Sequence, residues 1–296
     1  MAQLGYRFAP DEQPIRVASA TPLEPHASRF WRAWPFAPDP RALNAPDITV
    51  GALPAKLDEH YTDPRDDWGG GFRLSHPSIE GGFMDCPSAE EAANQLAGVL
   101  VAARVRAAAG SVAAHAASCA TPQGVVVLPG PSMSGKSTLS LQLMLAGGRL
   151  FGDDRLLIDA ARGTATALGL TPRLRLPVPA EAGAALAGLA RASGTADGEI
   201  AYLDLTDSQA APFNTTAPIA AFVAPERVAG GPARLAKSST SGIVRALLGG
   251  AVTNQGNSAA TLAAVARLAA RTPCWSLRWS NSAEAGALLW REFGKA

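Results

Sequence analysis

One segment of the sequence has the residue types and spacing of a phosphate-binding loop. Residues 130–137 read Gly-Pro-Ser-Met-Ser-Gly-Lys-Ser and match the pattern G-x-x-x-x-G-K-[ST] at every fixed position. The two glycines let backbone N–H groups curl around a phosphate without a Cβ clash. The Lys136 ammonium would contact the β- and γ-phosphates, and the Ser137 hydroxyl would ligate Mg²⁺. The residues predicted to bind the nucleotide are Gly130, Pro131, Ser132, Met133, Ser134, Gly135, Lys136, Ser137 and Thr138.

Two neighbouring carboxylates follow this loop. Asp153 and Asp154 lie 17 and 18 residues after Lys136, inside an apolar run that predicts a strand over 149–159. Neighbours in a regular strand point to opposite faces, so both carboxylates cannot face one atom unless the pair lies at the strand's end. A carboxylate beside Mg²⁺ and phosphate can accept the proton of a hydroxyl held in line with the γ-phosphate. The pair therefore favours phosphoryl transfer to a hydroxyl.

The residues around the loop predict the elements that position it. Residues 124–130 form a short apolar, β-branched run, which is typical of a central parallel strand buried on both faces. Residues 139–146 predict a helix that Gly147 and Gly148 end. The strand over 149–159 follows, which gives the order strand, glycine turn, helix, strand of a βαβ unit.

The rest of the chain alternates strand patterns with alanine-rich helix patterns, which predicts an α/β fold. Ser88 and Glu91 form a capping box before a helix that runs from Ala89 to about Ala109 and ends at Gly110. The further predicted elements are an extended segment at 174–179, strands at 200–205, 218–225 and 274–280, and helices at 180–193, 241–248, 259–270 and 283–293.

Composition and charge bound the class of protein. The 296 residues carry 26 Lys and Arg against 25 Asp and Glu, and this net charge of +1 argues against a general nucleic-acid binder. Three widely spaced cysteines and four scattered histidines favour neither a disulfide framework nor a metal cage. No run of 18 apolar residues and no signal-peptide pattern occurs. We therefore expect no membrane association and a cytoplasmic location.

The spacing of the candidate residues resembles that of a known family. His115 precedes Gly130 by 15 residues, and Arg-Leu-Phe-Gly-Asp-Asp at 149–154 follows the loop, as in the catalytic domain of HPr serine kinase/phosphorylase. That family shares a P-loop core with phosphoenolpyruvate carboxykinase. Its relatives include kinases that phosphorylate a serine of ribosomally made peptide precursors, such as lasso-peptide kinases. The specific part of the resemblance runs from His115 to Asp159.

The resemblance implies a role for each residue at a matching position. Asp153 would be the base that deprotonates the acceptor hydroxyl. Asp154 would lie near the metal, which Ser137 also binds. His115 would lie beside the phosphate-transfer site, together with Lys136.

The chain also departs from HPr kinase itself. Arg175 takes the place of that family's downstream arginine, but no glutamate stands two residues before it, and in the family that glutamate helps to bind metal. Residues 1–85 do not look like the family's N-terminal domain. We therefore expect a divergent relative with another acceptor. In it, an α+β extension over 1–85 would bind the substrate or cover the sheet, and 86–296 would form the kinase domain.

Other candidate residues carry weaker signals. Trp275, Leu277 and Trp279 share one face of a predicted strand, which favours core packing over a platform for stacking bases. Phosphoryl transfer usually also needs a positive charge beside the transferred group. The side chains that could supply it are Arg155, Arg173, Arg175, Arg234 and Lys237.

The leading hypothesis is a kinase that uses ATP and Mg²⁺ to phosphorylate a serine of a peptide or protein, such as a ribosomal peptide precursor. The same machinery would serve a small-molecule kinase that acts on a sugar or amino-acid hydroxyl. A third hypothesis is a nucleotide-binding regulatory module without an acceptor. No Asn-Lys-x-Asp guanine signature appears, which disfavours a GTPase. The preference between ATP and GTP and the presence of a homo-oligomer are left open.

Overall fold

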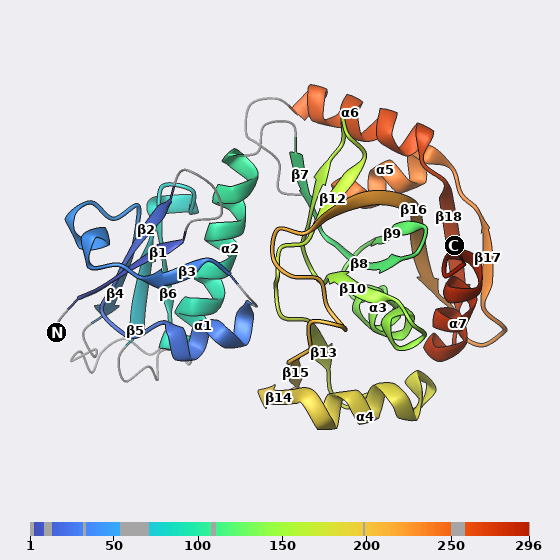
Figure 1. The fold of residues 1–296 in the computed structure, drawn as a ribbon, viewed down its shortest axis with the longest axis horizontal. Helices are drawn as coiled ribbons and strands as arrows, with labels where there is room; N and C mark the ends of the chain where they lie inside the picture. The colour runs from blue at the N-terminus through green and yellow to red at the C-terminus, as the bar shows by residue number, and fades with distance from the viewer. Residues whose placement is uncertain are drawn as a thin grey trace, which may run out of the picture. The chain divides into compact units, whose positions relative to one another are not determined.

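A computed structural model of the chain describes residues 3–8, 14–31, 34–53, 71–107, 111–197, 199–249 and 258–295. The described residues form seven α-helices and several β-sheets, so the predicted α/β class is confirmed at that level (Figure 1). The chain divides into two compact units, Met1–Arg104 and Val105–Ala296. The predicted helix end at Gly110 lies outside the described residues.

The first unit is built around a six-stranded sheet. Its strands, in spatial order, are β3 (Phe36–Pro38), β1 (Leu4–Phe8), β2 (Ile15–Ser19), β4 (Ile48–Leu53), β5 (Gly71–Ser75) and β6 (Phe83–Cys86). β2 and β4 pair in parallel, and the other neighbours pair antiparallel. The helical elements of this part of the chain are α1 (Glu24–Phe30), η1 (Pro40–Asn44), η2 (Glu80–Gly82) and α2 (Ala89–Ala107).

Helix α2 explains where the first unit ends. The sequence predicts a boundary at 85/86, whereas the chain divides into its two compact units between Arg104 and Val105, within α2. The Ser88 hydroxyl accepts the N–H of Glu91 at 3.1 Å, as the capping pattern predicts. Arg29 of α1 forms an ion pair with Glu90 in the first turn of α2. The helix is therefore tied to the first unit from its first turn onward.

The second unit holds a nine-stranded sheet. Its strands along one path are β10 (Arg149–Gly152), β8 (Ala116–Thr121), β9 (Gly124–Pro129), β16 (Thr216–Arg227), β12 (Thr164–Thr166), β11 (Leu156–Asp159) and β7 (Ser111–Ala114). Off this path, β18 (Cys274–Trp279) pairs with β16, and β17 (Arg234–Lys237) pairs with β18. β9 pairs in parallel with β16 but antiparallel with β8. β9 is therefore parallel to its neighbour on one side only, and β8 lies between β9 and β10.

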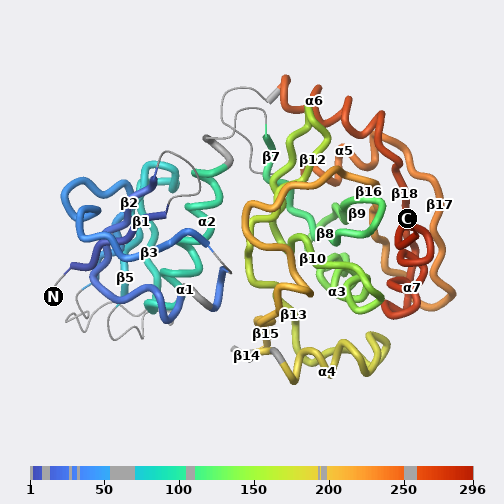
Figure 2. The backbone as a smooth tube through the Cα atoms, in the orientation of Figure 1, coloured from blue at the N-terminus to red at the C-terminus, as the bar shows by residue number. Residues whose placement is uncertain are grey.

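Helices cover both faces of this sheet (Figure 1 and Figure 2). They are α3 (Lys136–Leu145) and α7 (Ser282–Phe293) on one face, and α5 (Thr240–Leu248) and α6 (Ser258–Arg271) on the other. Along β9, Val126 and Leu128 join the core under α3 and α7, whereas Val125 and Val127 join the core under α5 and α6. All four side chains are fully buried, which confirms the prediction of a strand buried on both faces.

A smaller sheet completes the second unit. Its strands are β13 (Arg173–Arg175), β15 (Ile200–Leu203) and β14 (Gly194–Asp197). Between β13 and β14 the chain forms η3 (Ala180–Ala182) and α4 (Gly183–Ser193), and Leu186 of α4 joins the core under α3 and α7. Each element predicted between 180 and 293 is present with small shifts at its ends, and β14 and β17 are additional strands.

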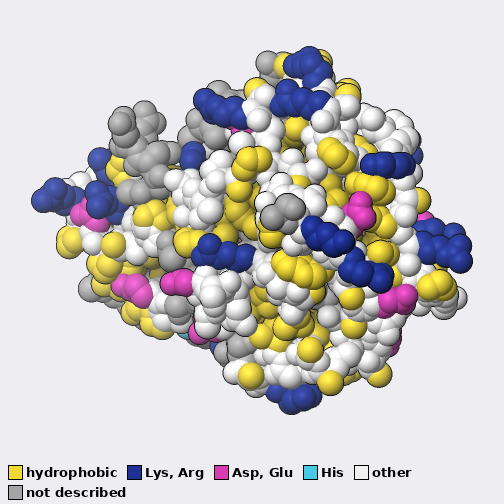
Figure 3. Space-filling model, turned by 45° about the vertical axis from the view of Figure 1, so that its right-hand side comes forward, with side chains coloured by type: hydrophobic (Ala, Val, Ile, Leu, Met, Phe, Trp, Pro, Cys, Tyr) yellow, Lys and Arg dark blue, Asp and Glu magenta, His cyan; other side chains and the backbone are white. Residues whose placement is uncertain are grey.

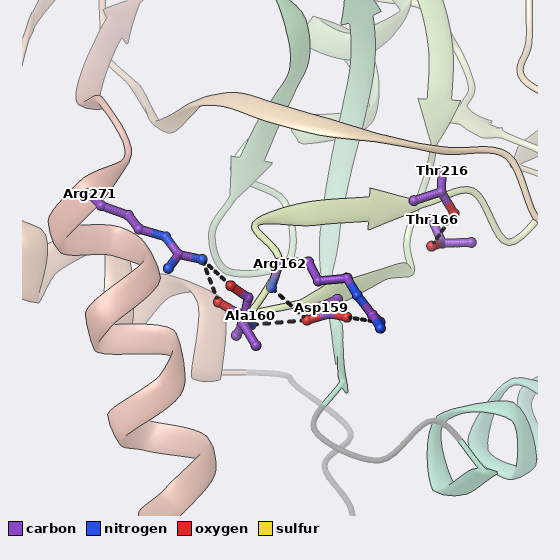
Figure 4. A network of polar contacts seen from close by, with 7 residues as sticks. Asp159, Ala160, Arg162, Thr166, Thr216 and Arg271 are labelled. Carbon is purple, nitrogen blue, oxygen red and sulfur yellow. Dashed lines mark hydrogen bonds and ion pairs between the residues drawn. The ribbon is translucent and has the colours of Figure 1, made fainter.

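The hairpin of β11 and β12 is fixed by a carboxylate at its turn (Figure 4). One oxygen of Asp159 accepts the N–H groups of Ala161 and Arg162 at 3.0 and 2.9 Å. The other oxygen accepts from the Arg162 guanidinium at 2.8 Å. Arg271, the last residue of α6, donates to the carbonyl oxygens of Ala160 and Ala161 at 3.0 and 2.6 Å. These contacts join α6 to the hairpin.

The surface carries charges of both signs. On the face shown in Figure 3, Lys and Arg side chains form several separate groups among apolar and neutral side chains. Within the described part of the chain, no helix has the length and apolar character needed to span a membrane.

Candidate active site

The glycine loop, which we define as residues 130–137, connects β9 to α3 as its sequence predicts. β9 ends at Pro129, and α3 begins at Lys136. Gly135 is the N-cap residue of α3 and has no side chain to bond the first N–H groups of the helix. Unbonded N–H groups and the positive end of a helix both attract phosphate.

Gly135 is required both by its backbone angle and by the space around it. Its φ of 87° lies in the left-handed region. A Cβ at this position would lie 2.3 Å from Cζ2 of Trp279. Trp279 is the last residue of β18 and is 3% exposed. The indole therefore packs directly on the glycine loop.

Lys136 is held inside the loop. Its side chain is buried, and Nζ donates to the carbonyl oxygen of Pro131 at 2.8 Å. Burial lowers the pKa of the Lys136 ammonium, and the carboxylates of Asp153 and Asp154 act in the opposite direction. A phosphate bound by the loop would offer this ammonium a stronger, charge-assisted partner than the carbonyl oxygen does.

The two carboxylates lie at a break between two strands. The sequence predicts one strand over 149–159, but β10 ends at Gly152 and β11 begins at Leu156. The cause is the backbone of Asp154, because its φ of 66° cannot continue an extended strand. The expectation that the pair lies inside a strand is therefore wrong, and the break lets the two side chains take unrelated directions.

Asp153 is enclosed by the protein beside the glycine loop. It is 3% exposed, and Oδ2 accepts the backbone N–H of Arg173 at 3.0 Å. Oδ1 is buried and has no partner of hydrogen-bond geometry among the described residues. Burial raises the pKa of Asp153, while the Arg173 N–H and the nearby Ser137 hydroxyl lower it. The free carboxylate oxygen and the Ser137 hydroxyl are the kind of ligands that Mg²⁺ prefers.

We expect Asp153→Asn to raise the stability of the nucleotide-free protein. The raised pKa means that this group costs stability as the pH rises above the pKa of an unfolded aspartate. A neutral amide removes that cost at pH 7, and its oxygen can still accept the Arg173 N–H. Relief of about 1–2 kcal/mol corresponds to about 2–8 °C in Tm. Thermal unfolding followed by circular dichroism measures this change.

Asp159→Asn is the matched control. Although burial acts against it, hydrogen bonds from Arg162 and Ala161 hold the pKa of Asp159 below its usual value. The charged carboxylate is therefore favourable at this site, and its loss should lower Tm. A lower Tm for Asp153→Asn as well would contradict the description of Asp153 as an incompletely satisfied buried charge.

Asp154 faces the cavity and has two partners. Its Oδ2 lies 3.0 Å from Nη2 of Arg173, and its Oδ1 lies 3.5 Å from Nε2 of His115. Burial lowers the pKa of His115, the charge of Lys136 lowers it further, and Asp154 offsets only part of this. The surroundings of His115 therefore disfavour its charged form, and Arg173 is the permanently charged partner of the carboxylate.

Asp154, His115 and Arg173 line one cavity of about 570 Å³. The predicted site residues that line it are His115, Ser132, Met133, Gly135, Lys136, Ser137, Thr138, Asp154 and Arg175. The predicted residues that do not line it are Gly130, Pro131, Ser134 and Asp153. Arg175 reaches the exposed tip of the glycine loop, where Nη1 donates to Sδ of Met133 at 3.8 Å.

The sequence does not identify much of the cavity wall. Arg173 contacts both carboxylates, yet in the sequence it is one of five equivalent cations. Trp279 is predicted as core and is buried, but it also forms part of the wall. Glu181 and Arg227 line the cavity as well, and no motif marks either of them.

Comparison with known proteins gives no family for the chain. No family model matches it. No curated protein matches it at a significant level either. The function is therefore argued from the residues of the cavity.

These residues fit a nucleotide with Mg²⁺. The cavity volume falls within the range of about 300–1,000 Å³ that is usual for small-molecule sites. In the described part of the chain, no group of three or more His, Cys, Asp or Glu side chains is placed to hold a metal. Mg²⁺ that binds with a nucleotide needs only one or two protein ligands in addition to phosphate oxygens. Ser137 lines the cavity and would hold it, with the carboxylate of Asp153 behind its hydroxyl.

Proposed function

We propose that this chain is an ATP-dependent kinase that transfers the γ-phosphoryl group to a hydroxyl, with a serine of a peptide or protein as the acceptor. The observation that carries the proposal is one cavity that joins the glycine loop to the carboxylate of Asp154. The loop by itself would support only nucleotide binding. An accessible carboxylate beside it supports transfer to a hydroxyl, since it can accept the proton that the hydroxyl loses.

The exposure of the two carboxylates favours the reverse of the roles that the sequence resemblance implies. Asp153 is 3% exposed and does not line the cavity, so neither an acceptor hydroxyl nor a metal in the cavity reaches it directly, but it lies near Ser137. Asp154 lines the cavity, and its side chain is 33% exposed. We therefore assign the base to Asp154 and the metal ligand to Ser137, with Asp153 behind that hydroxyl as the charge that orients it.

In this scheme the residues of the chain position the reactants and accept one proton. Lys136 and the backbone N–H groups of the loop hold the phosphates. Arg173 fixes the carboxylate of Asp154 and adds positive charge beside it. Asp154 takes the hydroxyl proton as the new O–P bond forms and the bond to ADP breaks. Mg²⁺, when bound, neutralises charge on the phosphate oxygens.

We further propose that the chain is a divergent relative of the HPr kinase-like P-loop kinases. The support is the spacing of His115, the glycine loop and the carboxylate pair, together with the order of β9, α3 and β10 around them. Arg175 stands where the family's downstream arginine would be expected, but the family's metal-binding glutamate has no counterpart two residues before it. The likeness to lasso-peptide kinases favours a peptide acceptor. Recognition of that acceptor by residues 1–85 stays a prediction.

ATP that carries heavy oxygen on the γ-phosphate tests this function. The full-length protein is incubated with labelled ATP, Mg²⁺ and a fractionated extract of the source cells, and mass spectrometry follows the label. Label on a serine of a peptide or protein supports the proposal and identifies the acceptor. Label on a metabolite would instead indicate a small-molecule kinase.

Asp154→Asn serves as the matched control in the same extract. This variant should keep the nucleotide site but lose transfer, so any label that it still attaches comes from other enzymes. Label found only in free phosphate, or in no product of the wild-type protein, would contradict the kinase and favour a nucleotide-binding regulatory module.

A further inference from the structure

The cavity continues from the glycine loop along helix α3. Gln142, in the second turn of α3, donates to the carbonyl oxygen of Ala182 at 2.5 Å and to Oγ of Ser282 at 3.3 Å. Ala182 and Ser282 both line the cavity. The cavity therefore has a second region beside the first two turns of α3. We call it the α3 end and define it by Glu181, Ala182, Arg227, Trp279 and Ser282.

The α3 end combines an apolar wall with one ion pair. Trp279 packs on Gly135 of the loop and belongs, with Ala182, to the core under α3 and α7. Arg227, the last residue of β16, forms an ion pair with Glu181 of η3. Cζ of Arg227 lies 5.6 Å from the centroid of the Trp279 ring. The Arg227 side chain lines the cavity and is 50% exposed, so a ligand in the cavity can contact it.

These groups suit a nucleoside better than a phosphate or an acceptor hydroxyl. A base has flat apolar faces, and a guanidinium plane stacks well on such a face. The phosphates are already held at the loop by Lys136 and backbone N–H groups. Thr138 of α3 also lines the cavity, so the lining continues from the loop onto the helix. The carboxylate of Asp154 and the guanidinium of Arg173 remain for the acceptor.

We infer that the α3 end is the nucleoside subsite, in which the Arg227 guanidinium stacks on the base next to Trp279 and Glu181 holds that guanidinium in position. This inference rests on the proposed function, because it needs the phosphates of the same ligand to lie in the glycine loop. Arg227 would contact the ligand, whereas Glu181 would act through Arg227 as a positioning residue. A competing use of the α3 end is to bind an apolar side chain of the acceptor.

Binding of MgADP and of magnesium pyrophosphate separates the nucleoside from the phosphates. Both are titrated into the full-length protein by isothermal calorimetry at one temperature and one Mg²⁺ concentration. The wild type should bind ADP at least about 10-fold more tightly than pyrophosphate. Arg227→Ala should weaken ADP binding by about 10–100-fold, as expected for the loss of a stacking partner, and leave pyrophosphate within about twofold. Glu181→Gln should weaken ADP binding by a smaller factor and likewise spare pyrophosphate.

Arg278→Ala is the matched control. Arg278 lies on β18 next to Trp279 and is 3.6 Å from a carboxylate oxygen of Glu226, but it is not among the cavity-lining residues. Its removal also takes a guanidinium out of a surface ion pair, and it should change neither titration. If this variant weakened ADP binding as much as Arg227→Ala does, the effect would be general electrostatics and the inference would be overturned.

Three other results would also decide the question. Equal loss of ADP and pyrophosphate binding in Arg227→Ala would place Arg227 at the phosphates and overturn the inference. Equal affinity of the wild type for both ligands would leave the base unrecognised and the α3 end free for the acceptor. Binding of neither ligand would contradict the proposed function itself. If Arg227→Ala does not fold, the wild-type comparison and Glu181→Gln still give the answer.

Discussion

Replacing Asp154 with asparagine should slow phosphoryl transfer by about 10²–10⁴-fold, the usual contribution of a general base, while MgADP affinity stays nearly unchanged. Asparagine keeps the shape of the side chain and an oxygen for the 3.0 Å contact with Arg173, but it cannot take a proton from the acceptor. Single-turnover transfer of labelled phosphate to the acceptor measures the rate. Calorimetric titration with MgADP measures the affinity.

Asp153→Asn is the contrasting variant because it removes a charge behind the loop rather than in the cavity. It should weaken MgADP binding by about 10-fold or more, since the charge that supports Ser137, the ligand of Mg²⁺, is lost. Binding of ADP without Mg²⁺ should change much less. If Asp153→Asn instead abolished transfer with nucleotide binding intact, and Asp154→Asn transferred normally, the roles implied by the family resemblance would hold. The exposure of the two carboxylates would then not determine their roles.

The sequence predicts the loop and its two flanking elements because short-range chemistry determines them. The alternation of Val125, Val126, Val127 and Leu128 between two cores needs only an apolar run short enough to be a strand. The glycine at 135 marks the turn, since its left-handed φ is strained for other residues. Both signals lie within a few residues of the feature that they predict.

The placement of the carboxylates is not predictable in the same way. Apolar residues on both sides of the pair favour one continuous strand, and the residue that breaks it, Asp154, is of a type that only sometimes adopts a left-handed backbone. That single backbone choice decides which carboxylate is enclosed and which lines the cavity. Residue types and their spacing do not predict this backbone conformation, so they leave the roles of Asp153 and Asp154 open.

The α3 end of the cavity is even harder to predict from the sequence, because residues of three separate segments form it. Glu181 comes from η3, Arg227 from the end of β16 and Trp279 from the end of β18. The last two meet because β16 and β18 pair in parallel with Arg227 opposite Trp279. Such a register is a long-range property of the sheet. In the sequence, Trp279 is therefore recognisable only as a core residue, which it is in part.

Gly135→Ala should be the most damaging addition of one methyl group to the site. The new Cβ would lie 2.3 Å from Cζ2 of the buried Trp279 ring, and alanine is strained at a φ of 87°. Backbone strain and overpacking together should cost about 2–4 kcal/mol, which corresponds to about 4–16 °C in Tm. MgADP binding should also be lost, because the loop cannot keep its N–H groups in place if the backbone moves away from the indole. Thermal unfolding with and without MgADP measures both effects.

Gly188→Ala separates this effect from a general response to replacing glycine. Gly188 lies inside α4, and a Cβ there would meet nothing within 4 Å. Alanine favours a helix interior by about 0.5–1 kcal/mol, so this variant should have an unchanged or higher Tm and normal MgADP binding. If Gly135→Ala behaved like Gly188→Ala, Trp279 would not pack on the glycine loop. The contact that joins the glycine loop to the α3 end of the cavity would then be absent.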